Sequence, residues 1–506
     1  MGEGAELAIA SIDAGTGGVR CMVVGKNGEV LGLSRRSWSY ETPLYLEIAK
    51  EFQPSEFWNL ICTVTKEALK KAGIPASKLE AVSTTSQRHG IVLLDADGKE
   101  LHGGPNSDAR GAMTQYIIEE ALGEKFLEIT GCWPPMMFAA SRLAWFEEEE
   151  PEIREAVAHL LPISDWITYR LSGEFSTEPS SASATGLLNI RTRKWSDEIL
   201  SVVGIERSIL PEIHCAGYVV AEVSSTAFKE CKLPEGLPVV QGGADTHCAL
   251  LTCQAEAGEV VVVAGSTTPV MMVVREPVCS SGQKIWSAPH MIPELWTLES
   301  NAMLTGAYIE WVIDFLCDRA ENPERCREET FSSLPEILKE IPPGSHETYA
   351  ALGPRVMDTQ RMTDIPFARV HFPQPALPGV IPLNSANLIH AVLENIAYSV
   401  RGNYEQLNNF RQSTSVKAVG GVTRSSVWLQ ILANVLGHPV RTPQQPEGSL
   451  LGAAICAAAG IGWYSSIEET AKNMVSWQPD FEPDERQREY ESYYTRWKEI
   501  WSLGED

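Results

Sequence analysis

The chain opens with short apolar stretches that are separated by glycine-rich turns. Residues 7–12 and 19–24 are apolar runs on either side of "AGTGG", and Asn27-Gly28 precedes another apolar run at 30–33. Such runs joined by such turns are typical of antiparallel hairpins, so three antiparallel strands are predicted. Neither GxxxxGK[ST] nor GxGxxG is present, and no helix is expected directly after the glycines. The turn is therefore neither a P-loop nor a dinucleotide fingerprint.

Helical and strand patterns alternate after this opening. Residues 55–71 carry apolar side chains at helical spacing, and Gly73 follows as a stop signal. Residues 79–86 are predicted as a strand that runs into the loop "QRHG", and 91–101 as strands around an Asp-Gly turn. "EGLPVVQGGADTHCALL" at 235–251 is predicted as strand, loop and helix. This alternation is typical of an α/β fold.

The opening pattern returns near the middle of the chain. "GEVVVVAGSTTPVMMVV" at 258–274 is again an apolar strand, a turn of small residues and an apolar strand. Two hairpins of one design suggest two related domains that face one ligand, although strand–turn–strand units are common enough to leave this open. We expect the boundary near 254–258, a mobile loop at 180–186 and a surface helix over 484–501.

Composition narrows the class of protein. A chain of 506 residues exceeds the size of a single core, so two domains are expected. Its net charge of −25 argues against a nucleic-acid partner. The first ten residues show no signal-peptide pattern and no run is long enough to span a membrane, so we expect a cytoplasmic protein without a membrane partner. The 11 cysteines form no CxxC pair and are expected to be reduced, structural thiols.

The first turn is the clearest candidate for chemistry. Its glycines let backbone N–H groups point inward as an anion nest, and Arg20 adds a fixed positive charge. Asp13 ends the strand, where a hydrated magnesium ion would be placed. The alternative is a glycine-rich hairpin with an incidental aspartate. Similar small-residue turns occur at 265–268 and 420–426, and three such elements in order favour phosphate binding.

Taken together, the motifs resemble the FGGY family of carbohydrate kinases in the actin-like ATPase superfamily, over essentially the whole chain. They are "DAGTGGVR" at 13–20, "QRHG" at 87–90, "NSDAR" at 106–110, "GGADTH" at 242–247, "GSTT" at 265–268, "TGAYIEW" at 305–311, "AVGGVTRSS" at 418–426 and "PEGSLLGAA" at 446–454.

The resemblance implies an α/β fold of two actin-like (ribonuclease H-like) domains. Each would be a five-stranded mixed sheet flanked by helices, with ATP and sugar in a central cleft. Residues 1–255 would form the sugar- and phosphate-binding domain, and 256–506 the nucleotide-binding domain. ATP and Mg²⁺ are the implied cofactors and a small sugar-like molecule is the implied partner; whether the chain forms a homodimer is left open.

The resemblance also implies roles for single residues. Asp245 would be the catalytic base, and it is also suited to be a helix N-cap; the two roles are compatible. Asp13 and Asp245 would bind the metal. The implied substrate-binding residues are Arg88, His89, Asn106, Asp108, Asp245 and Thr246. The implied ATP-binding residues are Gly15, Thr16, Gly17, Gly18, Arg20, Gly265, Ser266, Thr267, Gly306, Glu310, Gly420, Gly421, Val422 and Ser425. Gly452, in contrast, is expected to serve close helix packing.

The substrate is constrained less tightly. Segments 88–98, 164–174 and 289–293 resemble those of autoinducer-2 kinases, and xylulokinases come next. Glycerol kinases differ at Arg88-His89 and at Asn106. We therefore expect phosphorylation of autoinducer-2 in its open hydrated form, with a xylulokinase or another pentulose or polyol kinase as the alternative. A non-catalytic actin-like sensor of ATP and sugar is the alternative of another class.

Overall fold

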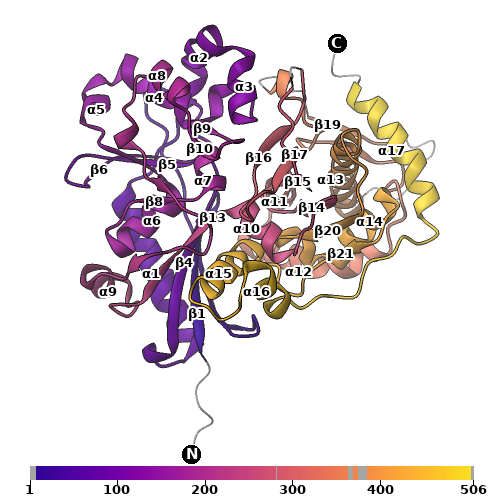
Figure 1. The fold of residues 1–506 in the computed structure, drawn as a ribbon. Coiled ribbons are helices and arrows are strands. Elements are labelled where there is room, and N and C mark those ends of the chain that lie inside the picture. Colours follow the sequence, from indigo (N-terminus) through magenta and orange to yellow (C-terminus); the bar gives the residue numbers. More distant parts are fainter. Residues whose placement is uncertain (1–6, 281, 363–367, 374–383, 503–506) are drawn as a thin grey trace, which may run out of the picture. The chain divides into compact units, whose positions relative to one another are not determined.

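The computed structural model describes residues 7–280, 282–362, 368–373 and 384–502 and contains two compact units (Figure 1). The first unit consists of the chain up to Ala257 together with Val273–Leu298 and Glu447–Ser476. The second consists of Gly258–Met272, Glu299–Pro446 and the chain from Trp477 onward. Residues 1–6, which belong to the stretch searched for a signal peptide, lie outside the described residues. Within the described ranges, no helix is long and apolar enough to cross a membrane.

A six-stranded mixed sheet forms the centre of the first unit. Its order is β12-β13-β4-β1-β2-β3. As predicted, the first three strands are antiparallel neighbours, whereas β4 lies parallel to both β1 and β13. The strands are β1 (Ala8–Gly15), β2 (Gly18–Gly25), β3 (Val30–Ser37), β4 (Leu79–Ser86), β12 (Val219–Glu222) and β13 (Pro238–Ala244).

The second sheet repeats this topology. Its order is β16-β17-β15-β14-β20-β21, and β14 lies antiparallel to β15 and parallel to β20, as β1 does to β2 and β4. The expectation of five strands per sheet is wrong by one, because β12 and β16 each add an outer strand. The strands are β14 (Glu259–Val263), β15 (Thr267–Val274), β16 (Trp286–Pro289), β17 (Trp296–Leu304), β20 (Ser415–Val419) and β21 (Val440–Arg441).

Helices flank the first sheet on both faces, and strand alternation decides what each face carries. In β1, Ala8, Ala10 and Ile12 are buried in the core with α1 (Pro54–Ala72) and α6 (Ile163–Ser172). The alternate position Asp13 therefore lies on the other face, where α15 (Gly448–Gly460) packs against β1, β4 and β13 (Figure 1). Thus α15, although late in the sequence, lies beside the first strands. The unit's other helices are α2 (Gln115–Leu122), α3 (Glu124–Thr130), α4 (Ala139–Glu149), α5 (Pro151–Ala156), α7 (Pro179–Ser183), α8 (Asp197–Val203), α9 (Ser225–Cys231), α10 (Asp245–Thr252) and α16 (Ile467–Met474), and a small sheet contains β5 (Ile91–Leu94), β6 (Glu100–Gly104) and β7 (His159–Pro162).

The second unit carries long helices. The sequence predicted two of them, α14 (Ser426–Leu436) and α17 (Gln487–Ser502), with approximate bounds. Ser425 is the N-cap of α14 and accepts a hydrogen bond from the Trp428 amide at 3.2 Å. The C-terminal helix is amphipathic, and Tyr490, Tyr494 and Trp497 are its buried aromatic residues. The helices are α11 (Gly306–Cys317), α12 (Pro323–Lys339), α13 (Ser385–Asn408), α14 (Ser426–Leu436) and α17 (Gln487–Ser502).

Two sequence expectations are wrong. Residues 180–186 are not a mobile loop: they form α7 and the turn after it, and residues 180–185 are buried because the small side chains fit against the sheet. The cysteines are not all reduced, because Cys317 and Cys326 form a disulfide with a Cα–Cα distance of 5.7 Å. The helical hairpin of α11 and α12 brings these two residues together, which their spacing of nine did not reveal.

Candidate active site

The predicted phosphate turn is the two-residue loop between β1 and β2. Gly15 pairs with Gly18, which leaves Thr16 and Gly17 exposed at the tip. A Cβ atom at Gly18 would lie 2.3 Å from the Arg36 carbonyl oxygen, so the close approach of β3 requires glycine there. A Cβ atom at Gly17 would meet no protein atom within 4 Å. The tip is therefore open to a ligand.

Asp13 and Arg20 face each other across this hairpin and form an ion pair. Asp13 is fully buried, and its Oδ2 atom accepts hydrogen bonds from Arg20 Nη2 and, at 2.6 Å, from Ser449 Oγ. Its Oδ1 atom is buried without a hydrogen-bond partner. An unpaired buried carboxylate oxygen is costly unless a ligand satisfies it, and carboxylate oxygen is what Mg²⁺ prefers. The residues present therefore fit a magnesium ligand at this atom.

The carboxyl ends of β1, β4 and β13 meet at one edge of the sheet, since these strands are parallel neighbours. Asp13 pairs with Thr85, and Gly243 pairs with the same residue. Asp13, the loop after β4 and Asp245 after β13 consequently lie at this edge. Asp245 is the first residue of α10, whereas the N-cap is Ala244. The predicted N-cap role is therefore wrong by one residue, because β13 continues up to the helix.

Asp245 has the electrostatics of a proton acceptor. Its Oδ1 atom accepts a hydrogen bond from the Thr246 amide at 2.7 Å. Burial and the negative charge of Asp13 raise the pKa of Asp245 to about 7, while the charges of Arg88 and Arg20 oppose this rise. A base whose pKa lies near the working pH combines availability with proton affinity. The arrangement can therefore accept a proton from a hydroxyl group at neutral pH.

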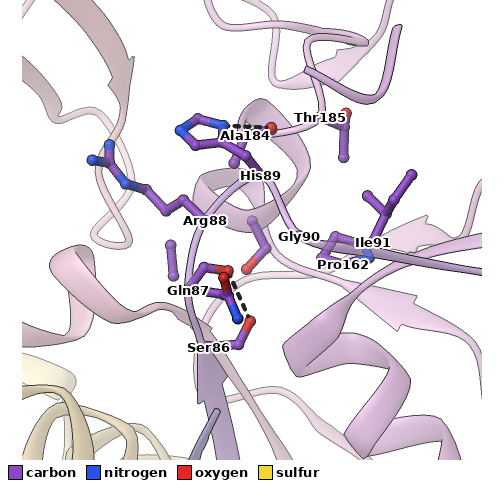
Figure 2. Close-up of a pocket in the computed structure, with 11 residues that line it drawn as sticks. Ser86, Gln87, Arg88, His89, Gly90, Ile91, Pro162, Ala184 and Thr185 are labelled. Atoms are coloured by element: carbon purple, nitrogen blue, oxygen red, sulfur yellow. Dashed lines mark hydrogen bonds between the residues drawn. The ribbon is translucent and has the colours of Figure 1, made fainter. Parts of the chain in front are cut away.

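A pocket lies beside this edge, within the first unit (Figure 2). His89 Nδ1 is 3.0 Å from the Ala184 carbonyl oxygen, so we assign the ring proton to Nδ1. Burial, together with the charges of Arg88 and Arg142, lowers the pKa of His89 to about 3. The neutral ring therefore leaves Nε2 as an acceptor. The pocket is lined by Ser86, Gln87, Arg88, His89, Gly90, Ile91, Pro162, Ser181, Ala184, Thr185 and Ala244.

Aromatic rings flank the pocket histidine. The rings of Phe138 and Trp286 meet that of His89 edge-on, with centroid distances of 5.2 and 5.8 Å. Figure 2 shows that the side chain of Arg88 extends from the loop in a different direction from Gly90 and Ile91. The site thus combines a neutral acceptor, apolar edges and a nearby cation.

Hydrogen bonds of Gln87 connect the pocket loop to the phosphate turn. Its Nε2 atom donates to the Tyr40 hydroxyl at 2.8 Å, and that hydroxyl donates to the Thr16 carbonyl oxygen at 2.7 Å. Its Oε1 atom accepts from the Asn106 amide at 3.0 Å, while Asn106 Nδ2 donates to Thr16 Oγ1 at 2.9 Å. The structure therefore brings Asn106 and Thr16 together. The sequence placed them in separate substrate- and ATP-binding groups and did not predict this contact.

Two further predicted substrate residues are buried in protein contacts. Arg110 Nε donates to both carboxylate oxygens of Asp108, at 3.0 and 2.9 Å, and Arg142 Nε lies 3.8 Å from Asp108 Oδ2. Arg142 in turn donates to the His89 carbonyl oxygen at 2.9 Å. Asp108 thus supports the pocket loop through Arg142, and its contact with substrate stays a prediction. The hydroxyl of Thr246 lies 3.3 Å from His247 Nδ1.

The predicted nucleotide residues of the second unit gather around one turn. The Gly306 amide donates to the Gly265 carbonyl oxygen at 3.2 Å, and the Val422 amide donates to the Ala264 carbonyl oxygen at 3.1 Å. A Cβ atom at Gly306 or Gly420 would lie 2.5 Å from these same oxygens. Three segments that are far apart in the sequence are thus packed together. Ser266 and Thr267 belong to this turn, Gly421 begins the short helix that contains Val422, and Ser425 ends it.

Glu310 lies four residues after Gly306, further along α11. It is largely exposed on α11 and forms an ion pair with Arg327 on α12 at 3.1 Å.

Sequence reasoning missed several contributors. Gln87 stood inside a recognised motif but was given no role, and Glu447 and Ser449 stood inside "PEGSLLGAA", where only Gly452 was considered. No local signal marked Phe138 or Trp286, because their position depends on tertiary packing.

Comparisons with known proteins agree with this architecture. The pattern of the N-terminal domain of the FGGY family of carbohydrate kinases matches residues 8–252, and that of the C-terminal domain matches residues 260–461. An autoinducer-2 kinase of Yersinia enterocolitica is 30% identical over 502 residues, which cover 98% of this chain and 94% of the relative.

Solved structures share the fold at low sequence identity. A xylulose kinase from Rhodospirillum rubrum has a TM-score of 0.81 at 22% identity, over 98% of each chain. A glycerol kinase from Plasmodium falciparum, solved with ADP, has a TM-score of 0.82 at 16% identity, over 100% of this chain and 99% of the other.

The repeated topology of the two sheets and the two matched domain patterns define a sugar kinase. The chain belongs to the FGGY family of carbohydrate kinases.

Proposed function

We propose that the protein is an ATP-dependent, magnesium-requiring kinase that phosphorylates a hydroxyl group of autoinducer-2 in its open hydrated form. The observation that carries the catalytic part is Asp245, a carboxylate with a raised pKa at the start of α10, beside Asp13 and a polar pocket. The substrate part is supported by relatives named autoinducer-2 kinase. A pentulose such as xylulose is the alternative, supported by xylulose kinases of the same fold.

In this proposal the first unit carries out proton transfer and phosphate positioning. Asp245 accepts the proton of the attacking hydroxyl group, and Arg20 faces the transferred phosphoryl group together with the open tip at Thr16 and Gly17. Asp13 Oδ1 and Asp245 would hold the magnesium ion, which, when bound, neutralises negative charge on phosphate oxygens. Phosphoryl transfer needs mainly such positioning and neutralisation, which these residues are suited to provide.

The pocket would orient an oxygen-rich substrate. His89 Nε2 accepts a hydrogen bond from a substrate hydroxyl, because Nδ1 is bound to the Ala184 carbonyl oxygen. The hydroxyls of Ser181 and Thr185 line the same pocket, and Arg88 adds five fixed donors. Several substrate oxygens would satisfy these groups, and the hydrated carbonyl of open autoinducer-2 places two hydroxyls on one carbon, which a pentulose in its keto form lacks.

Residues 256–506 are proposed as the nucleotide domain and 1–255 as the sugar domain, and the nucleotide would be bound by that part of 256–506 which belongs to the second unit. At this packed turn, Gly306 and Gly420 approach the carbonyl oxygens of Gly265 and Ala264 more closely than any residue with a side chain permits, which holds the three segments together. A cytoplasmic location also belongs to this proposal.

Release of ADP with and without substrate tests the proposal. Purified protein with ATP and Mg²⁺ should release ADP at a high rate only when autoinducer-2 or a pentulose is added. An actin-like ATPase or sensor would instead show the same ADP release without any sugar, and that result would overturn the proposed kinase activity.

A further inference from the structure

The start of α15 is hydrogen-bonded to Arg20 and Asp13 at the sheet edge that carries the candidate site. Glu447, the N-cap residue of α15, is buried and accepts a hydrogen bond from Arg20 Nη1 at 2.5 Å. Two residues later, Ser449 Oγ donates to Asp13 Oδ2 at 2.6 Å. Both residues come from the motif at 446–454, more than 400 positions away from the first hairpin. The phosphate turn is therefore built from both ends of the sequence.

The geometry restricts how Arg20 meets Asp13. A guanidinium group commonly binds both oxygens of one carboxylate through two parallel hydrogen bonds. Here Glu447 takes Nη1, so Arg20 reaches Asp13 through Nη2 and at Oδ2. Ser449 bonds to the same oxygen. The hydrogen bonds from Arg20 and Ser449 thus both fall on Oδ2 of Asp13, and Oδ1 is left buried without a partner.

The same helix also fixes the element that carries Asp245. The hydroxyl of Thr252 in α10 donates to the Gly448 carbonyl oxygen at 2.7 Å. A Cβ atom at Gly452 would lie 2.0 Å from the Cys248 carbonyl oxygen, so the two helices touch at this glycine. Helix α15 therefore contacts α10 and Asp13 at once.

We propose that Glu447 and Ser449 are positioning residues that keep Arg20 on Asp13 Oδ2 and thereby leave Asp13 Oδ1 free for a divalent cation. This inference rests on the proposed function, because it takes Asp13 as a magnesium ligand. Without Glu447, Arg20 would be able to cover both oxygens of Asp13. Without the Ser449 hydroxyl, the carboxylate would lose the bond that helps to hold its plane.

Cation binding tests this directly, without turnover. Free Mn²⁺ is measured by electron paramagnetic resonance as the metal is titrated into the protein with ADP. We expect Glu447→Gln and Ser449→Ala each to raise the apparent Mn²⁺ dissociation constant about tenfold, the usual effect of removing a residue that orients a metal ligand. Ser449→Ala changes no charge, so its effect reports position alone, and Ser449→Thr should restore binding.

Glu100→Gln is the matched control. Glu100 is also partly buried and pairs with an arginine at 2.6 Å, but it lies on β6 and outside the site. It should leave Mn²⁺ binding unchanged. The inference is overturned if Glu447→Gln and Ser449→Ala bind Mn²⁺ like the wild type while Asp13→Asn does not. If Asp13→Asn also binds normally, the proposed metal role of Asp13 itself fails.

Discussion

Replacement of Asp245 by asparagine removes the proposed base and leaves its surroundings nearly intact. Asparagine is almost isosteric, and its side-chain oxygen can still accept the 2.7 Å hydrogen bond from the Thr246 amide. What is lost is the ability to accept a proton, together with the charge that faces Arg88 and Arg20 and one of the two carboxylates proposed to hold magnesium. Loss of a general base lowers turnover by about 10²–10⁴-fold, which corresponds to about 3–5 kcal/mol in the transition state. Substrate binding should change much less, since other pocket groups make those contacts.

A coupled ADP-release assay with varied substrate separates kcat from KM. In the wild type, kcat/KM should fall as the pH drops below about 7, because the free carboxyl then becomes protonated. The Asp245→Asn variant should lack that dependence. Asp165→Asn is the matched control: burial also raises the pKa of Asp165 to about 7, but its carboxylate is hydrogen-bonded to Gln241 in the core. Retention of more than about a tenth of wild-type kcat in Asp245→Asn would refute the assignment.

Three further predictions concern specificity, stability and thiols. Arg88→Met should narrow or reverse the preference for autoinducer-2 over D-xylulose, because it removes the guanidinium donors proposed to contact the substrate oxygens; unchanged kcat/KM ratios would contradict this. Burial raises the pKa of Glu178 to about 7, so between about pH 4.5 and 7 the folded state keeps a proton that the unfolded state has lost. The free energy of unfolding of the wild type should therefore decrease as the pH rises from about 4.5 to 7. Glu178→Gln should remove up to about 3 kcal/mol of this decrease. The same change in the free energy of unfolding from pH 5 to 8 in wild type and variant would refute the prediction. Alkylation of unfolded, unreduced protein followed by mass measurement should label nine of the 11 cysteines, sparing Cys317 and Cys326; eleven labels would contradict the disulfide.

Much of the fold could be predicted because local patterns and tertiary structure agree. The glycine turn, the Asn-Gly turn and the run at 79–86 have the lengths and periods of the strands they form. The outer strands β12 and β16 are short and carry little pattern of their own, so the number of strands was underestimated. The buried segment at 180–186 misled for a related reason: small polar residues are typical of exposed loops, yet here the structure hydrogen-bonds and buries them.

The residues of the candidate site could be predicted from sequence motifs, but most of the hydrogen bonds between them could not. Asp13 and Asp245 follow the carboxyl ends of parallel strands, and Arg20 lies opposite Asp13 on the antiparallel strand β2, so strand pairing brings them to one edge of the mixed sheet. The partners Glu447 and Ser449 come from a helix far along the chain, and no spacing rule predicts which strand that helix covers. The ion pair of Asp108 was likewise invisible, because it depends on how the loop folds back.

We propose that this FGGY kinase prefers the open hydrated form of autoinducer-2 to pentuloses and glycerol. The most direct measurement is a comparison of kcat/KM for autoinducer-2, D-xylulose, L-ribulose and glycerol in the coupled ADP-release assay. We predict the highest kcat/KM for autoinducer-2. A kcat/KM for D-xylulose that exceeds that for autoinducer-2 by tenfold or more with the wild-type protein would contradict the claim and favour the xylulokinase alternative.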